Sequence, residues 1–370
     1  MFSIPLINPI FRMVMRIVSI VIFLLTILSA YGGKCNPEYL TIPAILCLAL
    51  PYLATLTILL TIFWLLTKRI FFTALGVLTI VACMGPLSQA MPLSFPKKAE
   101  PGQTTFKIIS WNVLHTDDIR DKDSHTNRAV EYMVNSDADV ICLAELDNFS
   151  SEELKNASPA LIDSLIRKYP FRAGLSSTDI KVLSKYPVDR AGHSLSEGNR
   201  HRFDFFKINF PGGKILNVGM VHLYSYDLSE EERNVVKEMK TVNGAKASVK
   251  EFKGTILSKL RNAFRQRATN ARDLRDAIDQ IRPTSPLIVC GDFNDVPASW
   301  TYNLVRGEDM KDAYAETNLG FTWTYNLHAF YFHIDQMLYR GPLEALSLKV
   351  GKINTSDHYP LVGEFAFTNN

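Results

Sequence analysis

The stretch Leu287-Ile288-Val289-Cys290-Gly291-Asp292-Phe293-Asn294-Asp295 carries the strongest indication of the fold. Its first four residues are apolar and predict a buried strand, which Gly291 is expected to end. Asp292 and Asn294 follow at spacing i and i+2, so both side chains lie on one face if the chain stays extended. A carboxylate beside a carboxamide can position a water molecule or a phosphate oxygen. An Asp/Asn turn is the simpler interpretation, so the prediction depends on how other strands end.

Five further segments carry oxygen or nitrogen ligands at or near the end of a predicted strand. They are Asn112 in 106–113, Glu145 in 139–145, His222 in 215–223, Asp335 in 332–339, and Asp357 with His358 before 361–367. Singly, a turn asparagine or a structural histidine is the ordinary interpretation. A carboxylate ending an apolar strand is unusual, because its burial is costly unless it is paired or metal-bound. In layered α/β folds such strand ends converge on one rim, where sites form.

This set of donors predicts phosphate chemistry. Carboxylates and carboxamides are hard oxygen ligands, which suit Mg²⁺ or Mn²⁺ better than zinc. Two histidines beside such an ion can help to offset the charge of phosphoryl oxygens. The five cysteines show no metal-ligand spacing, and we expect Cys142 and Cys290 to be buried, reduced thiols within strands.

The first 91 residues are almost uncharged, although the net charge of the 370-residue chain is only +3 and names no partner. Three apolar runs lie here, from Ile17 to Tyr31, from Ile42 to Thr67 and from Ile70 to Met91. The second and third exceed the roughly 20 residues that a helix needs to cross a bilayer. The first could be a signal peptide, but the spans that follow favour three transmembrane helices.

The distribution of lysine and arginine gives a weak preference for one orientation. With the N-terminus inside, four basic residues are cytoplasmic and three are outside. The first group is Arg12, Arg16, Lys68 and Arg69, and the second is Lys34, Lys97 and Lys98. We therefore expect an integral membrane protein with its C-terminal domain on the outer, periplasmic face of the inner membrane if the chain is bacterial.

Composition changes sharply after the apolar runs. Residues 92–104 contain three prolines and a glycine, which predicts a semi-rigid linker. From there, short apolar strands alternate with polar, helix-like stretches, which predicts an α/β domain. The expected organisation is a membrane anchor with three transmembrane helices over 1–91, a Pro-rich linker over 92–104 and one domain over 105–370.

The domain resembles the endonuclease/exonuclease/phosphatase superfamily, which includes DNase I, abasic-site exonucleases, neutral sphingomyelinases and inositol-polyphosphate phosphatases. The resemblance covers about residues 106–367 and depends on five motifs in the family's order. They are Trp111-Asn112, Leu143-Ala144-Glu145, Gly291-Asp292-Phe293-Asn294, Ile334-Asp335 and Ser356-Asp357-His358. It implies a four-layered αββα sandwich that hydrolyses a phosphoester by in-line attack of water, without a covalent intermediate.

The resemblance also implies the roles around the metal ion and the water. Glu145, helped by Asn112, would hold Mg²⁺ or Mn²⁺, with Asp357 nearby. Asp292 would orient and deprotonate the attacking water, and Asn294 would position that water or the phosphate.

Two histidines are implied to contact the scissile phosphate, His222 and His358, and Asp335 would fix the tautomer of His358. The acidic partner of His222 is less clear. Asp179 is a candidate, although Thr178-Asp179-Ile180-Lys181 departs from the family's Gly-rich approach to that strand. A histidine at the position of His222 is implied for the sphingomyelinase, phosphatase and DNase I branches, which argues against abasic-site repair.

Residues 231–275 hold 12 lysines and arginines but only five acidic residues, a net charge of +7. Near the rim, such a segment could attract a phosphorylated substrate or anionic headgroups. A solvated helical face explains it as simply, and the scarcity of aromatic residues argues against base stacking.

The sequence thus favours a membrane-anchored, divalent-metal-dependent phosphoesterase. Its partners would be the lipid bilayer and a phosphoester substrate, which could be a phospholipid headgroup, a nucleic acid or a small phosphoester. A nuclease acting on DNA or RNA outside the cytoplasm is the first alternative. A catalytically inactive binding module that keeps the fold is the second, and no obligate protein partner is inferred.

Overall fold

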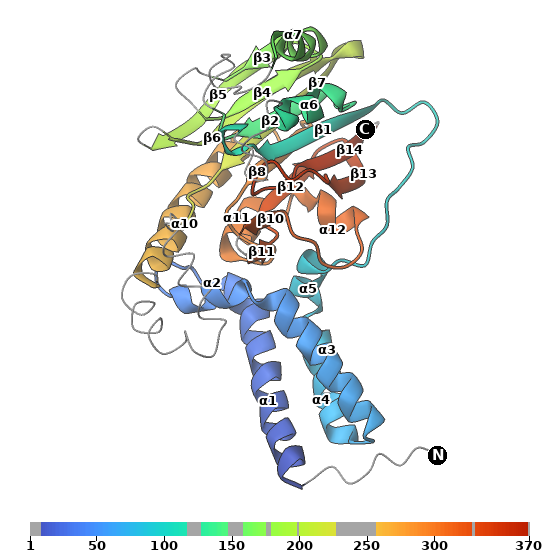
Figure 1. The fold of residues 1–370 in the computed structure, drawn as a ribbon, viewed down its shortest axis with the longest axis vertical. Coiled ribbons are helices and arrows are strands. Elements are labelled where there is room, and N and C mark those ends of the chain that lie inside the picture. Colours follow the sequence, from blue (N-terminus) through green and yellow to red (C-terminus); the bar gives the residue numbers. More distant parts are fainter. Residues whose placement is uncertain are drawn as a thin grey trace.

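The computed structural model describes residues 9–116, 127–146, 158–174, 179–197, 200–226, 257–327 and 330–368. A C-terminal α/β domain lies on one end of a bundle of apolar helices (Figure 1). The five cysteines are unpaired, and Cys142 and Cys290 are buried in the domain core.

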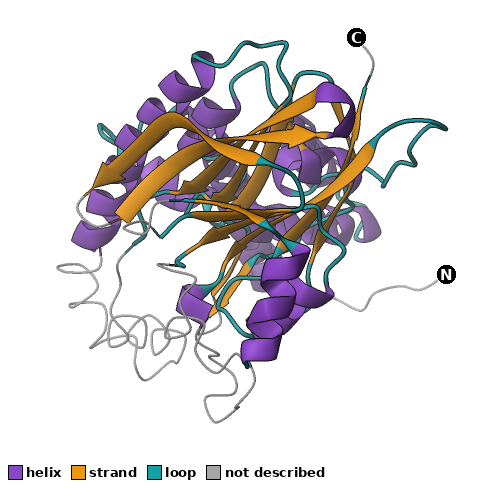
Figure 2. Ribbon diagram, turned by 90° about the horizontal axis from the view of Figure 1, so that it is seen from above, coloured by secondary structure: helices purple, strands orange, loops and turns teal. Residues whose placement is uncertain are grey.

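Two six-stranded sheets lie face to face in the domain (Figure 2). The first comprises β1 (Thr105–Asn112), β2 (Val140–Ala144), β3 (Phe171–Ala173), β4 (Lys181–Ser184), β13 (Leu343–Val350) and β14 (Leu361–Phe367). The second comprises β5 (Val188–Glu197), β6 (Arg200–Phe210), β7 (Lys214–His222), β8 (Leu287–Asp292), β9 (Lys311–Asp312) and β12 (Asp335–Arg340). Their strand orders are β13-β14-β1-β2-β4-β3 and β5-β6-β7-β8-β12-β9. Both sheets are mixed, because β1 pairs with β2 and β7 with β8 in parallel, whereas the other pairs are antiparallel.

Helices cover both outer faces, so the described residues form the four-layered αββα sandwich that the resemblance implies. These helices are α6 (Arg128–Asn135) and α7 (Pro159–Lys168) on the first sheet, and α10 (Leu257–Asp279) and α11 (Trp300–Arg306) on the second. Smaller elements are η2 (Leu114–Thr116), η3 (Pro211–Gly213), α12 (Ala313–Thr317), and the hairpin of β10 (Tyr325–Leu327) and β11 (Phe330–Phe332). The main apolar cluster fills the space between the sheets.

Strand β1 shows how one alternating segment builds two layers. Phe106 and Ile108 belong to the cluster between the sheets, whereas Ile109 and Trp111 belong to the cluster under α6 and α7. This is the two-residue period of a strand that is buried on both faces. The indole N–H of Trp111 donates to the carbonyl oxygen of His358 over 3.0 Å, which ties the end of β1 to the segment before β14.

Gly291 lies inside β8 and does not end it, which corrects the expectation from the sequence. The strand continues to Asp292, and Gly291 is paired with Val221 of β7 and Gln336 of β12. Its φ is +136°, and a Cβ atom there would lie 2.0 Å from the carbonyl oxygen of Val221. Glycine alone fits this conformation and this approach, so Asp292 stays on the ladder beside His222.

The first apolar run forms α1 (Pro9–Tyr31), which continues into η1 (Gly32–Lys34). Among the described residues, this 26-residue span is the one continuous helical segment long and apolar enough to cross a membrane. The other runs form bent pairs, α2 (Thr41–Cys47) with α3 (Leu50–Leu66) at 63° and α4 (Ile70–Ala82) with α5 (Met84–Ala90) at 66°. Where three transmembrane helices were expected, the structure has one clear apolar helix and two bent pairs.

Proline explains both bends. Pro51 and Pro86 lack the N–H that would bond to the carbonyl four residues earlier, at Cys47 and Ala82. Those two residues are the last of α2 and α4. The Ala82 carbonyl instead accepts a hydrogen bond from the hydroxyl of Tyr31. The prolines were visible in the sequence, and their effect on the two runs could have been predicted from it.

The Pro-rich segment after α5 runs along the surface of the domain. The Ser94 N–H donates to the Asn318 carbonyl over 2.9 Å, and the Lys97 N–H donates to the Leu346 carbonyl over 2.7 Å. The Lys97 ammonium pairs with Glu344 at 3.1 Å. This segment is therefore held to the domain at several points and is not a free spacer.

The apolar helices pack directly on the domain. Glu38, between η1 and α2, accepts two hydrogen bonds from the guanidinium of Arg272 on α10. Gly33 of η1 lies against Ala298, where a Cβ atom on Gly33 would be 1.8 Å from the Ala298 carbonyl oxygen. The apolar helices and the domain therefore share a close-packed seam.

The seam predicts that Gly33→Ala destabilises the full-length protein. The added methyl group must displace the backbone at Ala298, and overpacking of this kind costs roughly 1–3 kcal/mol. We expect a lower melting temperature of the protein in nanodiscs, measured by scanning fluorimetry. Gly85→Ala is the matched control, because its Cβ would meet nothing within 4 Å. Equal melting temperatures for the two variants would contradict the seam.

Candidate active site

The sheet registers bring the ligand-bearing strand ends to one edge of the sandwich. In the first sheet Asn112 pairs with Ala144, so Glu145 comes directly after that pair. In the second sheet His222 and Asp335 both pair with Asp292, from opposite sides of β8. The ends of parallel strands share an edge, and the antiparallel β12 begins where β8 ends. Side chains that are far apart in the sequence therefore meet there.

Asn112 joins the two sheets at this edge. Its side-chain amide donates to Glu145 Oε1 over 2.9 Å and to Asp292 Oδ2 over 3.3 Å. Its side-chain oxygen accepts from the backbone N–H of Leu114 over 3.2 Å. The amide, rather than the oxygen, therefore faces the two carboxylates, and Asn112 supports Glu145 through a hydrogen bond.

Two residues at the edge have left-handed backbone conformations. Glu145 has φ +55° and Asn294 has φ +52°. Asparagine tolerates this region, but glutamate pays a conformational cost of about 1 kcal/mol or more there. The turn at Glu145 places its carboxylate 3.4 Å from His222 Nε2. Strain of this kind is concentrated at functional sites.

Each histidine is held by an aspartate in the same way. His222 Nδ1 lies 3.0 Å from Asp179 Oδ2, and His358 Nδ1 lies 2.8 Å from Asp335 Oδ2. The opposite nitrogen, Nε2, faces the centre of the edge in both cases. It lies 3.4 Å from Glu145 for His222 and 3.5 Å from Asp292 for His358. Each aspartate thereby fixes the orientation of its imidazole ring.

These pairs favour the protonated form of both imidazoles. Burial would lower the pKa of His358, but the charges of Asp335 and Asp292 raise that pKa well above its ordinary value. Burial would also lower the pKa of His222, but the hydrogen bond to Asp179 and the charge of Glu145 raise that pKa above its ordinary value. The edge can therefore present two N–H donors to an anion.

The two central carboxyl groups are shifted in opposite directions. Burial raises the pKa of Asp292 to about 6, although the charge of His358 opposes the rise. Burial would also raise the pKa of Glu145, but the charge of His222 and the hydrogen bond from Asn112 keep the pKa of Glu145 below its ordinary value. Asp292 is thus suited to accept a proton near neutral pH, and Glu145 to remain a carboxylate.

Two candidates for a metal ligand lie at this edge, a cluster of three residues and the single carboxylate of Glu145. Among the described residues, Asp292, Asp335 and His358 offer ligand atoms that lie within 4.8 Å of one another. A protonated His358 cannot be a ligand, however, because it carries a positive charge and its Nδ1 is bonded to Asp335. Glu145 fits a hard divalent cation better, since its anionic side chain is 23% exposed and open to a ligand.

Asn294 and Asp357 lie at the same edge but are engaged with the chain. The Asn294 amide donates to the Leu223 carbonyl over 3.0 Å, and the Asn294 backbone N–H donates to Asp292 Oδ1 over 2.7 Å. Asp357 is buried, and its Oδ1 lies 3.3 Å from the hydroxyl oxygen of Ser356. Neither Asp357 nor Glu145 belongs to the group of ligand atoms around Asp292 within the described ranges. The role of Asn294 in positioning the water or the phosphate, and the roles of Glu145 and Asp357 in binding the metal ion, stay predictions.

Several supporting residues were not singled out from the sequence. The Ser356 hydroxyl donates to the Asn112 carbonyl over 2.8 Å and accepts from the backbone N–H of His358 over 3.1 Å. The Thr324 hydroxyl accepts from the backbone N–H of Asp335 over 3.0 Å. Ser356 is part of a quoted motif and could have been found, whereas Thr324 is separated from its partner by an intervening hairpin and carries no local signal.

The basic segment is partly structural. Residues 227–256 lie outside the described residues, and the remainder belongs to α10. Arg267 is fully buried and its guanidinium lies 3.5 Å from Asp295, while Arg275 pairs with Asp309 at 2.9 Å. Arg272 is paired with Glu38, so three of these positive charges are engaged in ion pairs within the chain.

The sequence model of the Endonuclease/Exonuclease/phosphatase family matches residues 109–358, more than half of the 370-residue chain. A second model, for a domain of unknown function (DUF8431), matches residues 12–90. Among curated proteins there is no match.

Solved structures with a similar arrangement are distant in sequence. An endonuclease/exonuclease/phosphatase from Beutenbergia cavernae is 16% identical, with a TM-score of 0.45 and coverage of 72% of each chain. Sphingomyelinase C from Streptomyces griseocarneus is 15% identical, with a TM-score of 0.44 over 72% of this chain and 100% of the other. A beta toxin variant from Staphylococcus aureus with bound magnesium ions is 15% identical, with a TM-score of 0.43 and the same coverage. These TM-scores are below 0.5, so the structures do not establish the family. Family membership is shown by the match of the sequence model to residues 109–358.

The pairing of Asp179 with His222 predicts a defect in Asp179→Asn. Loss of the carboxylate lowers the pKa of His222, so less of the protonated imidazole is present at neutral pH. We expect phosphodiester turnover by the full-length protein to fall by about 10²- to 10⁴-fold, and the high-pH limb of its pH profile to move to lower pH. Asp189→Asn, at an exposed aspartate on β5, is the control. Unchanged turnover with an unchanged profile would rule out this role for Asp179.

Proposed function

The chain belongs to the endonuclease/exonuclease/phosphatase family, and we propose on this premise that it is a membrane-anchored phosphoesterase that depends on a divalent metal ion. One observation carries the proposal. Two Asp-His pairs direct their Nε2 atoms toward the same edge, where Glu145 and Asp292 also lie. Two cationic donors beside two carboxylates suit an anionic substrate together with a metal ion and an attacking water.

Glu145, supported by Asn112, is the residue that we assign to the metal ion, with Asp357 as a further ligand. Mg²⁺ is the first choice and Mn²⁺ the second, because the donors are hard oxygens. When bound, the ion would offset charge on the phosphoryl oxygens.

The reaction is assigned to the chain's own residues as follows. Asp292 accepts a proton from a water molecule as the water oxygen forms a bond to phosphorus. The bond between phosphorus and the leaving oxygen breaks on the opposite side, and the leaving oxygen departs with the electron pair and takes up a proton from solvent. Asn294 holds Asp292 in place through its backbone N–H, and we assign to it the positioning of the water or the phosphate. Protonated His222 and His358 donate to the phosphoryl oxygens, and Asp335 keeps the His358 ring in position.

We propose further that all three apolar runs cross the bilayer, with α2 and α5 as the bent ends of the second and third spans. In support, the start of α1 and the turn between α3 and α4 lie at the end of the helices that is remote from the domain (Figure 1), and these segments carry Arg12, Arg16, Lys68 and Arg69. Basic residues favour the cytoplasmic side, which would put the domain on the outer, periplasmic face. The proposed organisation keeps an anchor over 1–91, a linker over 92–104 and the catalytic domain over 105–370.

Metal dependence and the roles of Asp292 and His358 can be tested together on the full-length protein. We expect hydrolysis of a chromogenic phosphodiester or phosphomonoester in Mg²⁺ or Mn²⁺, and its loss in EDTA with recovery when the ion is restored. Asp292→Ala and His358→Ala should each lower turnover by about 10³-fold, whereas Asp163→Asn, at an exposed position on α7, should not.

The same assay separates the alternatives. Full activity after metal removal would contradict a metal-dependent enzyme. Equal inactivity of wild type and variants on lipid, nucleic-acid and small phosphoesters would favour a binding module that keeps the fold. Activity confined to DNA or RNA would identify a nuclease.

Orientation has its own test. We expect a C-terminal alkaline phosphatase fusion to be active and a C-terminal green fluorescent protein fusion to be dark when the chain is expressed in a bacterium, because the domain is placed outside. The reverse result would place the domain in the cytoplasm and leave the chemistry of the site unaffected.

A further inference from the structure

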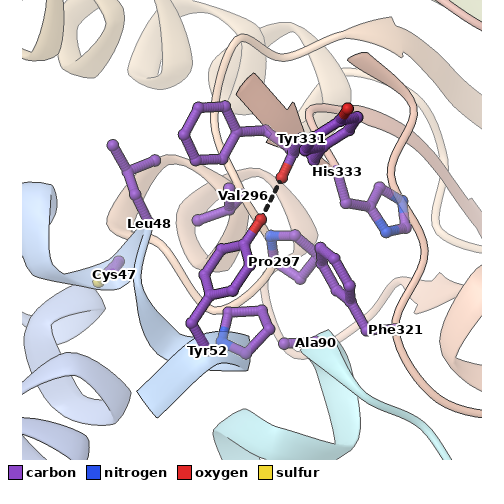
Figure 3. Close-up of a pocket in the computed structure, with 11 residues that line it drawn as sticks. Cys47, Leu48, Tyr52, Ala90, Val296, Pro297, Phe321, Tyr331 and His333 are labelled. Carbon is purple, nitrogen blue, oxygen red and sulfur yellow. Dashed lines mark hydrogen bonds between the residues drawn. The ribbon is translucent and has the colours of Figure 1, made fainter. Parts of the chain in front are cut away.

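The catalytic edge of the sandwich is the edge that meets the anchor. Cys47 and Leu48, at the end of α2, pack in one apolar cluster with Val296, Ile334 and Tyr325. Val296 follows Asp292 by four residues and Ile334 precedes Asp335 directly. The segments that leave and enter the site strands are thus the ones in contact with the membrane helices (Figure 3).

The hairpin of β10 and β11 links this contact to a site histidine. The Tyr325 ring lies 5.0 Å from the His358 ring and is tilted by 65°. On the anchor side, the Tyr52 hydroxyl of α3 donates to the Tyr331 carbonyl over 2.8 Å, as Figure 3 shows. The cavity left between the two parts measures about 10 Å³, roughly the room that one water molecule needs. The domain and the helices are therefore closely packed at this contact.

An exposed aromatic surface continues from this seam. It consists of Tyr52, Phe321, Trp323 and Tyr331, and we call it the aromatic rim. Its rings form a row of neighbours. The centroid distances are 6.0 Å from Tyr52 to Phe321, 6.4 Å from Phe321 to Trp323 and 5.4 Å from Trp323 to Tyr331. Tyr52, Trp323 and Tyr331 are 46, 42 and 44% exposed, and Leu319 beside them is 61% exposed.

The rim has the chemistry of a membrane interface. Residues 319–332 contain no lysine, arginine, aspartate or glutamate. Indole and phenol rings prefer the headgroup layer, where the apolar ring is buried and the N–H or O–H finds a polar partner. Tyr52 is also part of an apolar helix that runs away from the domain (Figure 1). The rim is thus continuous with a segment whose surroundings are lipid.

We propose that the aromatic rim sits in the headgroup layer of the bilayer that the anchor enters, so that the catalytic edge faces the membrane. The substrate class that this orientation favours is a phosphoester carried by a membrane lipid, which can approach along the bilayer surface. A nucleic-acid duplex would have to enter between the domain and the membrane. The substrate part rests on the proposed phosphoesterase activity, whereas the position of the rim rests on the proposed membrane anchor and not on that activity.

The position of the rim can be measured without any activity. The chain has four tryptophans, and subtracting the emission of Trp323→Phe from that of the wild type isolates Trp323. The protein would be placed in nanodiscs that hold one copy each. We expect a lipid with a spin label on its headgroup to quench the Trp323 emission at least about twofold more than iodide in solution does.

A matched control reports the far end of the domain. Phe171 is 39% exposed, and its strand β3 lies at the end of the domain remote from the apolar helices (Figure 1). Phe171→Trp in the Trp323→Phe background should be quenched by iodide and not by the labelled lipid. Trp323 open to iodide and unaffected by the lipid would overturn the proposal. Shielding from both quenchers that appears only at several proteins per disc would show a second copy on the rim, which overturns it as well.

The substrate class needs a paired assay. We would compare a phosphodiester lipid in vesicles with its water-soluble headgroup analogue, which lacks acyl chains. Trp323→Ser with Tyr331→Ser should lower the rate on the lipid at least about tenfold more than the rate on the analogue, since only the lipid is reached through the headgroup layer in which the two rings would be held. Phe171→Ser should change neither rate.

The outcomes separate the two proposals. Equal wild-type rates on both substrates, or equal losses in the rim variant, would overturn the lipid substrate while leaving the phosphoesterase intact. Inactivity of the wild type on every phosphoester would overturn the phosphoesterase, and the quenching result would still decide where the rim lies.

Discussion

The mutual neutralisation of buried charges at one edge of the sandwich is the constraint on which the rest depends. Asp292, Asp335, His222 and His358 are each at most 4% exposed. A buried charge without a partner costs several kcal/mol, so each must find an opposite charge or a donor. The Asp-His pairs provide this, and the Asn112 amide bridges the carboxylates of Glu145 and Asp292. Removing one partner would leave another group buried without an opposite charge or a hydrogen-bond donor. The side chains at the edge therefore depend on one another for their stability.

The sheet registers follow from that requirement. His222 and Asp335 flank Asp292 because β7 and β12 both pair with β8 without an offset at its last residue. A slip of one residue would turn every side chain of a strand to the opposite face. Gly291 permits the observed register at the critical place, since only glycine allows the Val221 carbonyl so near. A side chain at the residue before Asp292 would therefore force β7 and β8 apart beside the site.

The sequence revealed the strands and most of the edge because both depend on short-range patterns. Runs of apolar residues such as Val140–Ala144 and Leu287–Cys290 mark strands, and a polar residue after each marks the edge. The interior position of Gly291 was missed, since a glycine in a strand looks like an end unless its neighbours are known. Asp179 was a candidate without a distance to support it. The support from Thr324 and Tyr325, and the contact of Gly33 with Ala298, involve tertiary contacts to segments that no periodicity connects.

The contact between anchor and domain involves the loops that also shape the catalytic edge. The loop after β8 carries Asn294 and, two residues later, Val296 in the apolar cluster with Cys47. The hairpin before β12 carries Tyr325, which touches both that cluster and the His358 ring. A rigid loop packed on both sides loses little further entropy when it positions a reacting group. The apolar helices thereby contribute to the order of the edge as well as to its location, and the folding of one part is coupled to the other through these loops.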